Sequence, residues 1–113
     1  MIIKGKVWKF GANISTDLMM PGEVMTMADE AKGSLLCMRA NRPGWATRVQ
    51  PGDIIVAGSN WGCGSSRPAP RIIQNLRISL IVAESMSRLF FRNAVNIGFP
   101  VVLCPGVTGL FQE

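Results

Sequence analysis

Residues 51–67 read PGDIIVAGSNWGCGSSR, and this stretch decides the fold. Pro51 and Gly52 suit the central positions of a type II turn, in which the glycine supplies a positive φ. The segment Asp53–Ala57 that follows is continuous, apolar and β-branched, which is typical of a strand buried on both faces of a parallel sheet. A glycine-rich loop over residues 59–66 comes directly after this predicted central strand.

Downstream of the loop, the sequence alternates between helix and strand patterns. A helix is predicted to begin near Pro68, because proline is tolerated in a first helical turn. A second apolar strand is predicted at Ser79–Ala83, then a helix from a Ser85 cap to a Gly98 stop, then a strand at Phe99–Leu103. This order predicts parallel strands joined by right-handed crossovers.

The upstream signals are weaker. Residues 2–9 are predicted to form a partly exposed strand, and Gly11–Asp17 a loop rich in residues that bond their own backbone. From Glu23 to about Met38 helix propensity rises late in the segment. Asn41–Gly44 predicts a second chain reversal with proline and glycine.

Length and composition limit what the chain can be. Its 113 residues suit one domain over residues 1–113, and 48% hydrophobic against 17% charged residues favour a folded core. No apolar run approaches the roughly 18 residues of a membrane span, and the start lacks the apolar stretch of a signal peptide. A cytoplasmic protein without a membrane partner is expected.

The residue types exclude several chemistries. The chain has no histidine, and its three cysteines, Cys37, Cys63 and Cys104, form no CxxC pair. The lack of histidine rules out a histidine base and most catalytic metal sites in this chain, and the cysteine pattern argues against a disulfide framework or a self-contained zinc site. Twelve Lys and Arg against seven Asp and Glu give a net charge of +5, but the cations are scattered, which favours a small anionic ligand or an acidic protein over nucleic acid.

The loop after the central strand is the candidate anion site. Ligands of open α/β sheets lie beyond the carboxyl ends of strands, where a helix N-terminus offers N–H groups. Gly62 and Gly64 allow close backbone approach, and Ser65, Ser66 and Arg67 follow at once. The alternative is a tight turn whose serines cap the next helix. The adjacent arginine favours a carboxylate or phosphate site.

The same residues carry a family resemblance. Ala57–Arg67 resembles the signature loop of the small, swivelling subunit of 3-isopropylmalate dehydratase, within the aconitase superfamily. Val7–Gly11 and Ser15–Asp17 look like its N-terminal motif, Pro51–Val56 like its central strand, and Ser85–Pro100 like its later helix. The resemblance implies an α/β swivelling domain of the β/β/α kind, with a mixed sheet around a parallel βαβαβ core. Residues 1–113 would lack the family's C-terminal strands.

The resemblance also implies an activity. It is that of a hydro-lyase of leucine biosynthesis, which interconverts 2-isopropylmalate and 3-isopropylmalate by dehydration and rehydration. Ser65 would be the base that removes the carbon-bound proton, and Asp17 would belong to the same catalytic set. Ser66 and Arg67, with the backbone at Gly64, would bind the substrate carboxylates.

Cofactor and partner follow from the same resemblance. This chain would hold no metal, and a large subunit would carry the [4Fe-4S] cluster and the missing histidines. A serine base must be made more acidic, and each pKa unit takes about 1.4 kcal/mol of differential stabilisation. The isolated chain is therefore expected to be inactive, with the large subunit and a small dicarboxylate as its partners.

A further segment of the resemblance concerns the substrate's substituent. In the family, members that handle a third carboxylate place an arginine at the position aligned with Thr26. Here Val24, Met25, Thr26 and Met27 fit an alkyl group, because an unpaired buried carboxylate costs several kcal/mol. The alternative is that these methionines fill the core.

One departure keeps other functions open. The chain has Pro68-Ala69-Pro70 where the family reads Glu-His-Ala. The substrate could therefore be another alkylated malate or homoaconitate, or the chain could be a non-catalytic anion-binding or assembly module of the same fold. Nucleic-acid binding through the positive charge is a third alternative, and it predicts salt-dependent retention on DNA.

Overall fold

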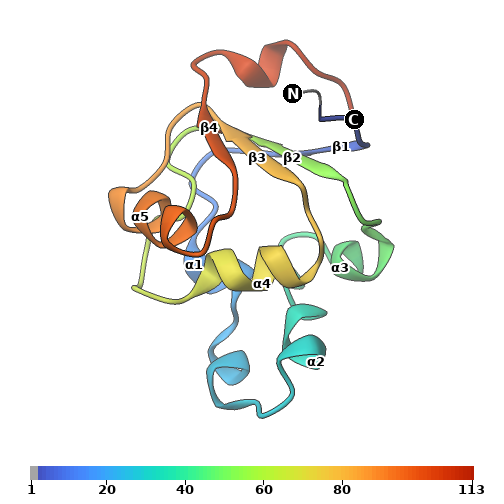
Figure 1. Cartoon of the computed structure of the whole chain (residues 1–113), viewed down its shortest axis with the longest axis vertical. Coiled ribbons are helices and arrows are strands. Elements are labelled where there is room, and N and C mark those ends of the chain that lie inside the picture. Colours follow the sequence, from blue (N-terminus) through green and yellow to red (C-terminus); the bar gives the residue numbers. More distant parts are fainter. Residues whose placement is uncertain (1–2) are drawn as a thin grey trace.

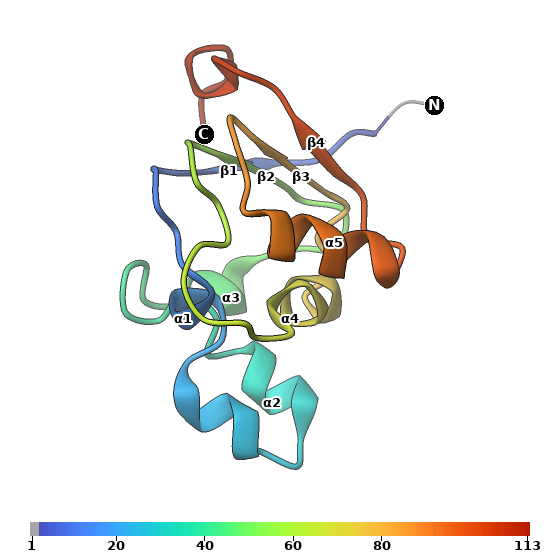
Figure 2. The same cartoon turned by 90° about the vertical axis from the view of Figure 1, so that its left-hand side faces the viewer.

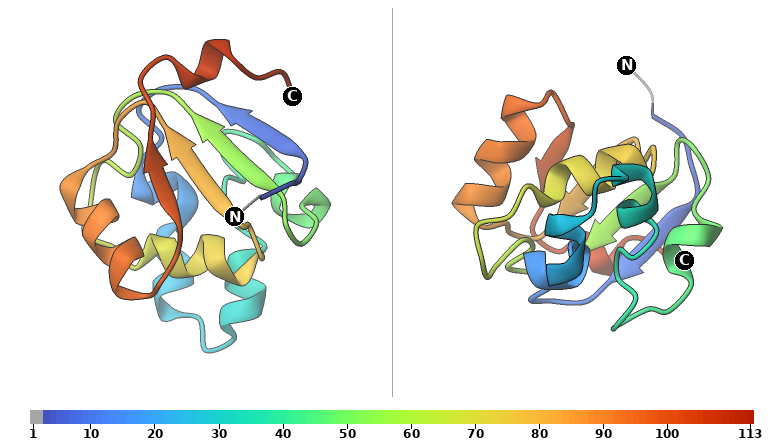
Figure 3. Two further views of the ribbon diagram at one scale, coloured as in Figure 1. Left: turned by 45° about the horizontal axis from the view of Figure 1, so that its top comes forward. Right: turned by 90° about the horizontal axis from the view of Figure 1, so that it is seen from below.

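One parallel sheet organises the chain. The computed structural model describes residues 3–113. Its strands are β1 (Val7–Phe10), β2 (Ile54–Ala57), β3 (Leu80–Ala83) and β4 (Val101–Leu103), which lie in the order β1-β2-β3-β4 with every neighbouring pair parallel (Figure 3). The predicted α/β class and the parallel core are confirmed. Within residues 3–113 the sheet is parallel throughout, so the expected mixed sheet is not seen there.

The helices lie together on one side of the sheet. They are α1 (Thr16–Met19), α2 (Glu30–Ser34), α3 (Trp45–Arg48), α4 (Ala69–Asn75) and α5 (Arg88–Asn96) (Figure 1). A sheet whose strands follow one another in chain order places successive right-handed crossovers on the same face. Figure 2 shows α2 furthest from the sheet and α4 between them. None of the helices in residues 3–113 has the length and hydropathy to cross a bilayer.

The end of the chain crosses part of the other face of the sheet. A short 3₁₀ helix, η2 (Val107–Gly109), lies over that face (Figure 1). Glu84 fixes this segment, because its carboxylate accepts a hydrogen bond of 2.5 Å from Thr108 Oγ1 and one of 3.2 Å from the Gly106 N–H.

Several predicted boundaries are corrected. The single helix expected late in Glu23–Met38 is broken into a 3₁₀ helix, η1 (Gly22–Thr26), and the short α2. The cap of α5 is Ser87 rather than Ser85, because Ser87 Oγ accepts the hydrogen bond from the Phe90 N–H.

The first strand also differs from its prediction. β1 begins later and ends one residue later than the predicted residues 2–9, and Ile2 lies outside the described residues. Its partner β2 aligns Val7 with Ile54 and Phe10 with Ala57.

The two proline-glycine turns have different outcomes. In the turn before β2, Gly52 has φ +93° and the Asp53 N–H donates to the Gln50 carbonyl over 3.1 Å, as predicted. The other turn closes one residue later than predicted, with a 3.1 Å hydrogen bond from the Trp45 N–H to the Arg42 carbonyl.

Aromatic side chains connect the sheet to its helices. Phe10 packs edge to face on Trp45 and on Trp61, and Trp61 packs in the same way on Phe90, with ring centroids 5.2, 6.0 and 6.1 Å apart. Such pairs add about 0.5–1.5 kcal/mol each to the burial of the rings. The loop that contains Trp61 is therefore anchored in the core.

Candidate functional site

The loop after β2 is tied to the loop after β1. The Gly62 N–H donates to the Ile14 carbonyl and the Thr16 N–H donates to the Cys63 carbonyl, both over 2.8 Å. Because the strands are parallel, their carboxyl ends meet at one edge of the sheet. The predicted loops therefore come together there, and Asp17 lies beside the glycine-rich loop.

A third loop, after β3, holds the glycine-rich loop from the other side. The Ser87 N–H donates to the Trp61 carbonyl, and Ser87 Oγ donates to the Gly62 carbonyl, each over 2.8 Å. Gly62 has φ +80°, and a Cβ there would lie 2.5 Å from the Cβ of Phe90. Glycine meets this backbone and this contact without strain, whereas any side chain here would displace Phe90.

Ser65 and Ser66 are presented at the surface of the loop. Both are exposed, and neither hydroxyl makes a hydrogen bond to another residue of 3–113. Thr16 Oγ1 donates a 2.6 Å hydrogen bond to the Ser65 carbonyl, which fixes the backbone at that position. The N–H groups of residues 64–67 likewise donate no hydrogen bond within the described part of the chain. The run therefore offers adjacent N–H and O–H donors, the arrangement that binds anions.

Arg67 is held over the start of α1. Its Nε lies 3.1 Å from Asp17 Oδ1, and its Nη1 donates a 2.7 Å hydrogen bond to the Met20 carbonyl. The Arg67 side chain is 20% exposed, against 52% for Asp17. Nη2 makes no hydrogen bond to residues 3–113, so a planar, oriented pair of donors remains for a carboxylate.

The helix N-terminus contributes less than the sequence suggested. Pro68 and Pro70 have no N–H, while the Ala69 N–H donates to the Arg67 carbonyl and the Arg71 N–H to the Pro68 carbonyl. The start of α4 thus has no spare N–H for an anion. The helix N-terminus was expected to add free N–H groups beside the loop, and this expectation is corrected. The donors come instead from the loop itself.

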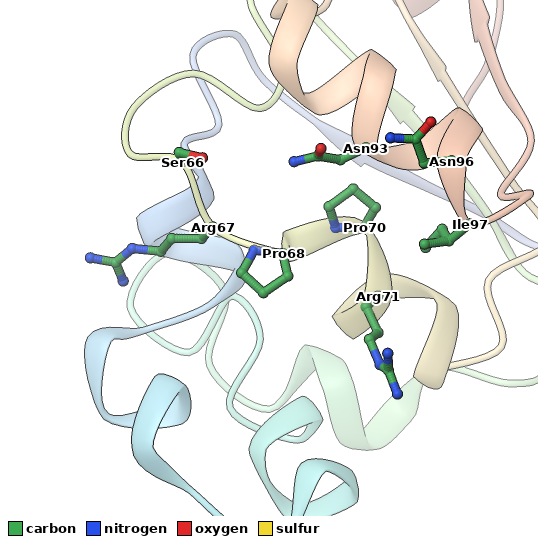
Figure 4. A pocket seen from close by; sticks show the side chains of 8 residues that line it. All are labelled: Ser66, Arg67, Pro68, Pro70, Arg71, Asn93, Asn96 and Ile97. Atoms are coloured by element: carbon green, nitrogen blue, oxygen red, sulfur yellow. The ribbon is translucent and has the colours of Figure 1, made fainter.

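Two hollows flank this loop. One, of about 70 Å³, is lined by Ser65, Arg67 and Asn93 among others, and we call it the Ser65 hollow. The other, of about 290 Å³, lies between α4 and α5 and includes Ser66, Arg67, Asn93 and Asn96; we call it the Pro68 hollow (Figure 4). Ser65 and Arg67 therefore border open space and are not turned into the core.

The substituent segment Val24–Met27 divides into buried and exposed residues. Val24 is 5% exposed, packed so that a Cβ on Gly33 would lie 2.8 Å from its Cγ1, whereas Met25 is 51% exposed. Thr26 is exposed and its hydroxyl donates to the Glu23 carbonyl, while Met27 packs against the core. The segment starts beside the site, because a Cβ on Gly22 would lie 4.0 Å from Arg67 Nη1.

The residues do not fit a metal or iron–sulfur cluster. No group of three His, Cys, Asp or Glu side chains within residues 3–113 could hold a metal ion. Cys37 is buried and Cys63 and Cys104 are partly exposed, all as free thiols. Burial raises the pKa of the Cys37 thiol far above its ordinary value, so it stays protonated.

Two residues at the site escaped the sequence analysis. Thr16, which anchors the Ser65 carbonyl, stood within the quoted Ser15–Asp17 motif without an assigned role. Asn93 lines both hollows. It falls three residues after Phe90 on the buried face of α5, where helical spacing calls for an apolar residue. That interruption of the apolar face was a signal available in the sequence.

Known proteins share the sequence and the fold of this chain. Residues 10–104 match the aconitase C-terminal domain family. The isopropylmalate/citramalate isomerase small subunit of Methanocaldococcus jannaschii is 44% identical over 99% of this chain and 67% of its own length. The methanogen homoaconitase small subunit of Methanothermobacter thermautotrophicus is 46% identical over 90% of this chain and 61% of its own length.

A solved structure gives the same result. The crystal structure of 3-isopropylmalate dehydratase from Methanocaldococcus jannaschii matches with a TM-score of 0.92 and 37% identity, over 100% of this chain and 67% of that one. The chain thus spans about two thirds of the length of the relatives it matches. It belongs to the aconitase C-terminal domain family, among the small subunits of 3-isopropylmalate dehydratase and its related isomerases.

Proposed function

We propose that the chain acts as the small subunit of an isopropylmalate-type hydro-lyase, which interconverts 2-isopropylmalate and 3-isopropylmalate together with a large subunit. The observation that supports this most is the run of residues 64–67, whose N–H groups, two hydroxyls and Arg67 Nη2 make no hydrogen bond within residues 3–113 and lie at an exposed edge. The substrate is a dianion, and these are donors suited to carboxylates. The names of the relatives as small subunits support a large partner.

Each residue of the loop has a role in this proposal. Arg67 binds one carboxylate of the malate through Nη2, while Ser66 and the neighbouring N–H groups bind the same or the second carboxylate. Asp17 is a positioning residue, because its ion pair with Arg67 fixes the plane of the guanidinium. Thr16 holds the Ser65 carbonyl and so sets the direction in which the Ser65 side chain leaves the backbone.

Ser65 is proposed as the base. Its alkoxide takes the proton from the carbon next to a carboxylate, the C–H electron pair forms the carbon–carbon double bond, and the hydroxyl group leaves from the adjacent carbon. Rehydration in the opposite sense completes the isomerisation. Removal of the hydroxyl group is the chemistry that a [4Fe-4S] cluster on the large subunit would supply.

The alkoxide needs several sources of stabilisation. The positive charge of Arg67 and the N–H groups around Ser65 that donate no other hydrogen bond favour the deprotonated Ser65 Oγ. Because the prolines remove N–H groups from the start of α4, the helix end supplies little of it. The remainder has to come from the partner subunit and from exclusion of water on docking. Activity is therefore proposed for the assembled pair alone.

The substituent segment favours an alkylated malate over a tricarboxylate. The segment Gly22–Met27 contains no lysine or arginine, and Arg39, which pairs with Glu23 of this segment, already has its carboxylate partner. A third carboxylate beside Met25 would find no cation in the segment. Citramalate and isopropylmalate, named for one relative, therefore fit better than homoaconitate, named for another.

The test is reconstitution with a cluster-bearing large subunit. The pair is assayed on 3-isopropylmalate, citramalate and homoaconitate, with the chain alone as a control. The proposal expects turnover of the alkylated malates by the pair, none by the chain alone, and at least tenfold lower kcat/KM on homoaconitate. An inactive pair that still binds malates would favour the non-catalytic module, and retention on DNA that weakens with salt would favour nucleic-acid binding.

A further inference from the structure

Asn93 stands on the wall of α5 that faces the glycine-rich loop. The helix turns Phe90 and Ala94 into the core, where both are buried, and Asn93 lies beside them, half-buried. Phe90 packs directly under Gly62, so α5 and the loop are in contact. The backbone of the loop and the position of Asn93 are therefore fixed relative to each other.

Asn93 lines both of the hollows that flank the loop. It lines the Ser65 hollow with Ser65 and Arg67, and it lines the Pro68 hollow with Ser66 and Arg67. Figure 4 shows its side chain pointing from α5 toward the segment that carries Ser66, while the Arg67 side chain extends away from α5 on the far side of that segment. Asn96, one turn further along α5, lines the Pro68 hollow and not the Ser65 hollow.

The Asn93 amide makes no hydrogen bond to any residue in 3–113. Two amides on α4 are engaged, because Asn75 Nδ2 donates to Glu30 and to Ser34 and Gln74 Nε2 donates to the Ile97 carbonyl, whereas on α5 the amides of Asn93 and Asn96 both make no hydrogen bond within residues 3–113. An amide carries two donors and an acceptor, and the amide of Asn93 borders open space in both hollows. It is therefore available to a ligand that enters from the side of the loop.

We infer that Asn93 is a substrate-binding residue, whose Nδ2 donates to a carboxylate of the diacid held by Ser66 and Arg67. This inference rests on the proposed function and extends it across the hollow to a second element. An amide donates without adding charge, so it orients one carboxylate of the diacid while Arg67, on the other side of the loop, pairs with the second one. The site then has donors on two walls, the loop and α5, which fix the orientation of the diacid.

The test compares four small subunits, each reconstituted with the same large subunit: wild type, Asn93→Ala, Asn93→Asp and Asn96→Asp. Asn93→Asp keeps the shape but replaces the donor with a charge of the same sign as the substrate. Asn93→Ala loses one hydrogen bond to a charged group, which corresponds to about a tenfold rise in KM. Asn93→Asp is expected to raise KM further, because its charge repels the substrate carboxylate. Because the contact is made in ground and transition states alike, kcat is expected to stay within threefold.

The control adds the same charge one turn away. Asn96→Asp is expected to change KM by less than threefold, and thermal melts of the variants check that each one is folded. Equal KM values for wild type and both Asn93 variants, in an active pair, would overturn this inference and leave the proposed function standing. A wild-type pair without activity on any malate would overturn both. A rise in KM for Asn96→Asp equal to that for Asn93→Asp would show a long-range charge effect and would also overturn it.

Discussion

Arg67 Nε lies 3.1 Å from Asp17 Oδ1, so the cation of the glycine-rich loop is fixed by a carboxylate from the first turn of α1. The pair joins two segments that are far apart in the sequence. Two contacts fix the guanidinium of Arg67, one from Nε to Asp17 and one from Nη1 to the Met20 carbonyl, and together they set the direction of the free Nη2.

The first prediction concerns this pair. Arg67→Lys should lower kcat/KM of the reconstituted enzyme by about tenfold to a hundredfold, because lysine cannot hold the planar two-donor geometry. Asp17→Asn should lower it less, since the cation remains but its plane is released. Steady-state kinetics on 3-isopropylmalate measure both. An effect of Asp17→Asn larger than that of Arg67→Lys would argue against a positioning role.

A second prediction separates backbone strain from packing in the loop. Gly62 and Gly44 both have positive φ, +80° and +79°, but only the Gly62 position has a ring against the missing Cβ. Gly44→Ala should cost about 1 kcal/mol of unfolding free energy, and Gly62→Ala about 3 kcal/mol, because Phe90 must also move. Urea denaturation at pH 7 gives both values. If the two variants lost equal unfolding free energy, the contact between position 62 and Phe90 would not add to the cost of the positive φ.

A third prediction concerns the cysteines. Cys37 is 1% exposed and burial raises the pKa of its thiol, so it should react with iodoacetamide only when the chain unfolds. Cys63 and Cys104 are partly exposed and should be alkylated in the native protein. Mass spectrometry of labelled peptides, with and without urea, measures each site. Labelling of Cys37 at the rate of the other two in the native state would contradict its burial.

A fourth prediction is a pH dependence. Hydrogen bonds from Asn75 and then Arg71 hold the pKa of Glu30 below its ordinary value of 4.5. The folded state therefore binds fewer protons at this group than the unfolded chain, and its contribution to stability is present above pH 4.5 and lost as pH falls through the lowered pKa. Wild type should melt above Glu30→Gln at pH 7, and the difference should vanish at low pH.

The melting temperatures of Glu30→Gln also test the contact between α2 and α4. The carboxylate joins α2 to α4, so removing its charge tests that connection. A difference in melting temperature that grows as the pH falls would contradict the sign of the pKa shift. Activity should be unchanged at pH 7, because Glu30 lies outside the loop that carries Ser65.

The parallel core could be predicted from the sequence because each strand is a short apolar run bounded by strong signals. Asp53–Ala57 follows a proline-glycine turn, and Ser79–Ala83 follows a predicted helix, so both were found within one residue. Residues 23–38 could not be predicted in this way. Their short elements are set by tertiary contacts, such as Val24 packed against Gly33, and not by a periodic pattern.

In the candidate site, too, some features could be predicted from the sequence and others could not. Ser65, Ser66 and Arg67 are consecutive, so their proximity could be predicted from the sequence, and the family resemblance brought in Asp17. The contact of Thr16 with the Ser65 carbonyl and the position of Asn93 depend on how distant segments pack. The free N–H groups expected at the start of α4 are missing for a local reason, because Pro68 and Pro70 have no N–H.

The most direct measurement compares wild type, Ser65→Ala and Ser66→Ala in the reconstituted pair, with kcat and KM determined on 3-isopropylmalate. Both serines are exposed and make no side-chain hydrogen bond within residues 3–113, so neither substitution should unfold the chain. The account predicts that Ser65→Ala abolishes turnover while the substrate still binds, and that Ser66→Ala mainly raises KM. Turnover by the Ser65→Ala pair at the wild-type rate would contradict the assignment of Ser65 as the base.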